Sequence, residues 1–101
     1  MKYLSTPTGI ASLVLEELIA LAKQYDLYKL ILFGSRARGD FHKKSDIDLA
    51  FSGGDKVRFA LDADELTSTL LTFDFVDLDK ELQPALLESI EKEGLILYEK
   101  I

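Results

Sequence analysis

Residues 33–51, FGSRARGDFHKKSDIDLAF, limit the possible folds of this chain more than any other stretch. A glycine-serine pair and four Lys or Arg side chains precede Asp46 and Asp48, which are separated by a single isoleucine. From Asp46 to Phe51 apolar residues occupy every second position, which predicts a strand with the two aspartates on one face. Because a carboxylate is costly to remove from water, the fold must place a compensating charge beside this face.

The rest of the chain alternates between helical and strand patterns. Apolar residues at three-and-four spacing predict a first helix, with Thr8 as its N-cap. Asp55 is expected to cap a helix that carries apolar residues as far as Leu70, and Pro84 to begin the last helix. The polar segment 35–45 is expected to be a loop that can contain a helical turn. The predicted elements are a helix at 8–25, strands at 28–33 and 46–51, a helix from Asp55, a strand at 73–79, a helix at 84–93 and a strand at 95–99.

This order predicts an α/β (α+β) fold, a small mixed β-sheet with helices packed on it. The length of 101 residues suits a single domain that spans residues 1–101. The connection between the strands at 28–33 and 46–51 allows either a parallel or an antiparallel pair, so their direction stays open.

Composition narrows the possible partners. The formal charge of −6 disfavours a long nucleic acid, because sequence-independent binding depends on the neutralisation of phosphates. The chain has no cysteine, its N-terminal residues do not resemble a secretory signal, and its apolar runs are too short and polar to span a bilayer. We therefore expect a cytoplasmic protein that binds no membrane.

The two aspartates predict a metal site. Residues two apart on a strand lie about 6 to 7 Å from each other on one face, where their charges repel. Mg²⁺ relieves this repulsion, because it binds one or two carboxylates and completes its shell with water and phosphate oxygens. A third carboxylate is expected from the strand at 73–79. Asp77 is favoured over Asp74 and Asp79 because it lies in the middle of that strand.

The cationic loop before the aspartates predicts a phosphate site. Gly34 permits close approach of the backbone to a ligand, and Ser35 adds a hydroxyl and a backbone amide. Arg36 adds planar donors for phosphate oxygens. We also expect Ser45 to bind the nucleotide. A nucleoside triphosphate bound to Mg²⁺ matches a cationic loop next to a carboxylate cluster.

At these residues the chain resembles the DNA polymerase β-like nucleotidyltransferase superfamily. GSRARG followed by SDIDL is similar to its signature, most of all in the MNT (minimal nucleotidyltransferase) branch, whose small proteins pair with HEPN-domain toxins. VDL at 76–78 and EGLILYE at 93–99 extend the resemblance over nearly the whole chain. It implies a polymerase β-like fold, phosphate contact by Gly34 and Ser35, and a catalytic, metal-binding trio of Asp46, Asp48 and Asp77.

The resemblance also implies an activity. The chain would act as an antitoxin that transfers AMP from ATP to a tyrosine hydroxyl of its partner toxin, with Asp77 as the expected catalytic base. Two other functions stay open: masking of the toxin without catalysis, and nucleotidyl transfer to a small molecule. The expected assembly is a homo- or hetero-oligomer. No residue that reads the nucleotide base can be named.

Overall fold

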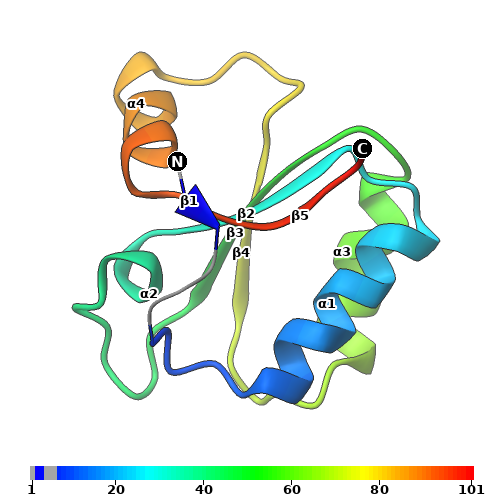
Figure 1. Ribbon diagram of the computed structural model, residues 1–101, viewed down its shortest axis with the longest axis horizontal. Coiled ribbons are helices and arrows are strands. Elements are labelled where there is room, and N and C mark those ends of the chain that lie inside the picture. Colours follow the sequence, from blue (N-terminus) through cyan, green and yellow to red (C-terminus); the bar gives the residue numbers. More distant parts are fainter. Residues whose placement is uncertain (1, 4–6) are drawn as a thin grey trace.

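The computed structural model, which describes the backbone of residues 2–3 and all of residues 7–101, is a mixed five-stranded sheet with helices on both faces (Figure 1). The predicted fold class is confirmed. None of the helices in this part of the chain is long and apolar enough to cross a membrane. The elements are β1 (Lys2–Tyr3), α1 (Ser12–Gln24), β2 (Lys29–Phe33), α2 (Ser35–Arg38), β3 (Ile47–Ser52), α3 (Lys56–Leu66), β4 (Phe73–Asp77), α4 (Pro84–Glu93) and β5 (Leu95–Glu99).

The strands lie in the order β1-β5-β2-β3-β4. β2 runs antiparallel to both β3 and β5, whereas β3 and β4 are parallel and connected through α3. The strands expected at 28–33 and 46–51, whose relative direction the sequence left open, are therefore antiparallel. β1 pairs in parallel with β5 and was not predicted, because a strand of two residues is too short to have a periodicity.

The two faces of the sheet have separate apolar cores. α1 and α3 cover one face, where Leu30, Leu49 and Phe51 belong to the larger core. α4 covers part of the other face, where Ile90 packs with the side chains of Ile31, Phe33 and Ala50. In Figure 1, α1 and α3 lie together on one side of the sheet, and α2 and α4 lie on the other. β3 therefore has buried residues on both faces, whereas Asp48 near its beginning is partly exposed.

Two helix boundaries differ from the prediction. The first helix begins at Ser12, not near Thr8, because the buried Thr8 hydroxyl accepts a hydrogen bond from the N–H of Ile10 instead of capping a helix. α3 ends at Leu66, and Leu70 lies in the following loop with its side chain fully exposed. The Asp55 cap is confirmed, since its carboxylate accepts a hydrogen bond from the N–H of Arg58 at 3.1 Å.

Candidate active site

Three carboxylates share one face at the end of β3. Asp48 and Asp74 are register partners in the parallel pair of β3 and β4, so their side chains lie next to each other on the same face. Asp46, one residue before β3, accepts a hydrogen bond from the hydroxyl of Thr72, one residue before β4. The acidic cluster, which we define as Asp46, Asp48 and Asp74, is thus contributed by two adjacent strands.

The charge of Asp48 is poorly compensated within the chain. Burial of this carboxylate raises its pKa, and the negative charges of Asp74 and Asp46 raise it further, whereas the nearby Arg38 lowers it. Neither Asp48 nor Asp74 makes a side-chain hydrogen bond or ion pair with residues 2–3 or 7–101. The half-buried Asp48 and the exposed Asp74 therefore form a pair of carboxylates that favours the binding of a cation at this face.

The glycine bend predicted to hold phosphate lies against the same carboxylate. Phe33, the last residue of β2, is the register partner of Asp48, and Gly34 follows it with φ 76° and ψ −157°. This backbone conformation is essentially restricted to glycine. A Cβ at position 34 would overlap the Oδ2 atom of Asp48. Gly34 therefore permits the chain to turn into α2 in direct contact with the acidic cluster.

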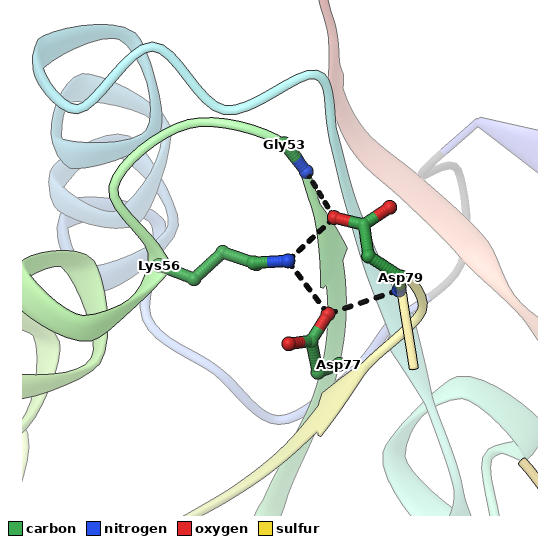
Figure 2. A network of polar contacts seen from close by, with 4 residues as sticks. All are labelled: Gly53, Lys56, Asp77 and Asp79. Atoms are coloured by element: carbon green, nitrogen blue, oxygen red, sulfur yellow. Dashed lines mark hydrogen bonds and ion pairs between the residues drawn. The ribbon is translucent and has the colours of Figure 1, made fainter. Parts of the chain in front are cut away.

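Asp77 does not join the acidic cluster. It is the register partner of Phe51, so its side chain lies on the opposite face of the sheet from Asp48 and Asp74. Figure 2 shows Asp77 and Asp79 around the ammonium group of Lys56, at distances of 2.8 and 2.5 Å. Asp79 also accepts a hydrogen bond from the N–H of Gly53 at 2.7 Å. Asp77 was expected to be the third metal ligand, and the register overturns that placement, because Asp77 lies three positions after Asp74 and alternation puts the two side chains on opposite faces.

Two neighbouring aromatic residues could have identified Asp74 from the sequence. Phe73 and Phe75 alternate with Asp74 and pack against the larger core, together with Phe51. The carboxylate between the two aromatic residues must then point to the other face, where Asp48 lies. The position of Asp77 in the middle of a predicted strand was a weaker guide, since β4 in fact ends at Asp77.

The guanidinium of Arg36 is not available to phosphate. The side chain is buried, with 1% of its surface exposed, and it stacks on the ring of Phe41. Its Nε and Nη2 atoms donate to the carbonyl oxygen of Ser45 at 3.1 and 3.0 Å, and Nη1 donates to that of Thr8 at 3.0 Å. A further bond reaches the carbonyl of Lys43. Arg36 therefore stabilises the loop before Asp46 by hydrogen bonds to its carbonyl groups, and its guanidinium is not free to contact a nucleotide.

The remaining predicted residues surround the cluster. Ser35 is the first residue of α2 and is half-buried beside Gly34. Ser45 precedes Asp46, and its hydroxyl accepts a hydrogen bond from the N–H of His42 at 2.7 Å, which closes the turn before β3. Arg38 is exposed and bridges Asp40 and Glu93, at 3.2 and 2.9 Å. These two carboxylates raise the pKa of Arg38.

The donors of the acidic cluster fit a hard divalent cation that arrives with a phosphate ligand. Among the residues that the structure describes, no three carboxylate, imidazole or thiol groups are arranged to hold a metal ion by themselves. Mg²⁺ does not require such a set, because it binds through one or two carboxylates and takes its other ligands from water and phosphate. Asp48 and Asp74 offer that number of carboxylates next to the Gly34 bend.

Comparison with known proteins identifies the fold. The family model described as "Polymerase beta, Nucleotidyltransferase" matches residues 16–101. Among curated proteins, none matches the sequence.

Several solved structures resemble the chain. A structure described as a toxin-antitoxin with AMP-PNP has 27% identity and a TM-score of 0.66, covering 85% of this chain and 73% of the other. A mutant MntA-HpeT toxin-antitoxin has 25% identity and a TM-score of 0.66 over the same shares. The MntA-HepT toxin-antitoxin has 21% identity and a TM-score of 0.64, covering 89% of this chain and 74% of the other, and shows similarity of fold.

Proposed function

Because the chain belongs to the polymerase β nucleotidyltransferase family, we propose that it transfers AMP from ATP to a tyrosine hydroxyl of a HEPN-class toxin and thereby acts as the antitoxin. The resemblance to minimal nucleotidyltransferases is confirmed by the family match and by the toxin-antitoxin structures that share its fold. The observation that carries the proposal is the contact of the Gly34 bend with Asp48, which is itself the neighbour of Asp74.

Each part of the site has a role in this proposal. Gly34 and Ser35 bind the phosphate tail of ATP, as the family resemblance implies. Asp48 and Asp74 provide carboxylate oxygens for Mg²⁺, with Asp74 taking the place first given to Asp77, and Asp46 completes the set once its hydrogen bond with Thr72 is exchanged for the metal. When bound, Mg²⁺ neutralises phosphate charge and polarises the α-phosphate. Arg36 and Ser45 position the loop before Asp46 rather than touch the nucleotide.

The transfer step exchanges one bond for another. The oxygen of the acceptor hydroxyl forms a bond to the α-phosphorus, and the bond from that phosphorus to the oxygen that bridges the α- and β-phosphates breaks. Pyrophosphate leaves with the electron pair, and the hydroxyl proton passes to the carboxylate of Asp74. Reactions of this kind depend mainly on positioning and on charge stabilisation, which is what a rigid strand pair next to a glycine bend provides.

Two of the similar structures support a toxin as the partner, and one of them also supports the nucleotide. At 25% and 27% identity, each is described as a toxin-antitoxin, and one of them contains AMP-PNP, an analogue of ATP. An intact acidic cluster also favours catalysis over masking, because a protein that only covers its toxin does not need uncompensated carboxylates on a sheet face.

The experiment that tests this function measures transfer of label. The purified chain is mixed with the product of the adjacent gene, Mg²⁺ and ATP labelled at the α-phosphate, and the same mixture is made with the double variant Asp46→Asn plus Asp48→Asn. We expect label on the partner with the natural chain and none with the double variant. Absence of label in both mixtures, with the toxin still neutralised, would show that masking is the function.

A further inference from the structure

An open cleft of about 570 Å³ lies between α3 and β4, on the face of the sheet opposite to the acidic cluster. Val57 and Leu61 of α3 line it together with Phe73 and Phe75 of β4. The two helix residues are 73% and 55% exposed, and the two rings stack with their centroids 5.6 Å apart. Exposed apolar surface of this kind, bordered by charged side chains, is typical of a docking site.

β4 is also an edge strand. It lies at the end of the sheet, and β3 is its strand partner among residues 2–3 and 7–101. The N–H of Ile47 donates to the carbonyl of Thr72, and the N–H of Leu78 donates to the carbonyl of Phe51, so the even-numbered residues of this segment bond toward β3. By alternation, the backbone groups of Phe73 and Phe75 point outward, where they can pair with another strand.

The edge of β4 lies on the side from which an acceptor must approach. Across the sheet the order is Gly34 after β2, Asp48 in β3, Asp74 in β4, and then the free edge. With the phosphate tail at Gly34 and the α-phosphate at Asp48, pyrophosphate leaves toward β2. The attacking oxygen must come from the opposite direction, since attack and departure are in line.

We propose that the acceptor segment of the partner protein binds as an added β-strand along the outer edge of β4. Its apolar side chains, at alternate positions, enter the cleft between α3 and β4, and its hydroxyl-bearing side chain lies on the other face beside Asp74. Main-chain hydrogen bonds then provide affinity and the cleft provides specificity. This docking mode deepens, and rests on, the proposed transfer to a protein hydroxyl.

Charge favours a different protein over a second copy of this chain as the occupant. Each copy carries a formal charge of −6, and edge pairing of two copies would bring their Asp74 faces side by side. Like charges on neighbouring strands destabilise a pair. The occupant is therefore an extended segment that carries alternate apolar residues on one face and a hydroxyl with basic neighbours on the face beside the acidic cluster.

The first test changes the cleft and leaves the acidic cluster intact. Leu61→Glu places a charge in the cleft, and Leu66→Glu, at a residue of the same helix that is 63% exposed and outside the cleft lining, is the matched control. We expect Leu61→Glu to raise the KM for the partner protein about tenfold or more, in line with loss of an interface anchor, with Mg-ATP affinity unchanged. The control should behave as the natural chain. An unchanged KM in Leu61→Glu overturns the docking mode.

The second test observes the strand edge directly, by hydrogen exchange of single backbone amides. Addition of the partner protein should slow exchange at Phe73 and Phe75 about tenfold or more, because their outward N–H groups become hydrogen-bonded. Unchanged exchange at both residues in the bound complex overturns the proposal. So does slowing that depends on the concentration of this chain alone, since the occupant would then be a second copy. If label is never transferred but both amides are slowed by the partner, the proposed function fails and the docking mode stands.

Discussion

Asp48 and Asp74 are register partners across the parallel pair of β3 and β4, which places two carboxylates side by side on a sheet face. No described cation forms an ion pair with either, and their proximity is part of why the pKa of Asp48 is raised. A fold gains no stability from such a pair alone. The pair becomes favourable when a divalent cation and a phosphate ligand bind to it, which is why we assign it to nucleotidyl transfer.

Gly34→Ala should abolish Mg-ATP binding, because the added Cβ would displace the Asp48 carboxylate. The positive φ at this position should also cost on the order of 1 to 3 kcal/mol of folding stability. Gly39→Ala is the matched control, since Gly39 also has a positive φ but its Cβ would meet open space. Calorimetric titration with Mg-ATP distinguishes the two variants. Equal affinity in Gly34→Ala and the natural chain would show that the bend does not determine the site.

Arg36→Met should destabilise the protein by at least about 3 kcal/mol, because each hydrogen bond to a charged group contributes about 1.5 to 3 kcal/mol. The buried guanidinium bonds to carbonyl groups of Thr8, Lys43 and Ser45, which would lose their donor. Arg38→Met, at an exposed residue of the same short helix, should change stability little. Urea unfolding measures both. Comparable stability of the two variants would mean that the hydrogen bonds of Arg36 do not stabilise the loop before Asp46.

The Lys56 network predicts a pH dependence of stability. Lys56 holds the pKa of Asp77 below its usual value, and the Gly53 N–H together with Lys56 does the same for Asp79. A carboxyl whose pKa is lower in the folded state stabilises the fold above its unfolded pKa, about 3.9, and loses that contribution as the pH falls through the folded value. The two carboxylates also raise the pKa of Lys56, so its contribution is lost only at alkaline pH.

Lys56→Met should therefore lower the free energy of unfolding at pH 7, by less than Phe59→Ala, a core truncation that should cost about 3 to 5 kcal/mol. The deficit should shrink as the pH falls below about 4, where the carboxyls of both proteins become protonated. Urea unfolding between pH 3 and 7 provides the measurement, with the exposed Lys44→Met as control. A deficit that stays constant over this range would contradict the pairing of Lys56 with the two aspartates.

The sequence was sufficient to predict most elements of the fold. Helix 84–93 and strand 95–99 appear with the predicted bounds, because a proline at the first turn and a glycine at the end delimit the helix. The acidic face of β3 is also confirmed, since strict alternation determines it. The sequence did not determine which face of the strand at 73–79 would join Asp48, because a shift of the register by one residue moves every side chain to the other face. Asp77 was therefore assigned to the face of Asp48, where the structure has Asp74.

The burial of Arg36 could not be predicted from local pattern. Its hydrogen-bond acceptors are backbone carbonyls at positions 8, 43 and 45, and their position depends on how the segment before α1 packs against α2. An arginine in a polar, glycine-containing loop next to an expected phosphate site is equally compatible with a surface role. Tertiary packing therefore decides between a phosphate ligand and a structural anchor.

The most direct measurement is the stabilisation of the natural chain, Asp74→Asn and Asp77→Asn by ATP, with Mg²⁺ and with excess chelator. At a ligand concentration of about one hundred times Kd, binding should raise the free energy of unfolding by about 2.7 kcal/mol. We predict this increase for the natural chain and Asp77→Asn in Mg²⁺ only, and its loss in Asp74→Asn. If Asp74→Asn keeps the increase while Asp77→Asn loses it, or if ATP stabilises equally in chelator, the assignment of the metal site to Asp46, Asp48 and Asp74 is wrong.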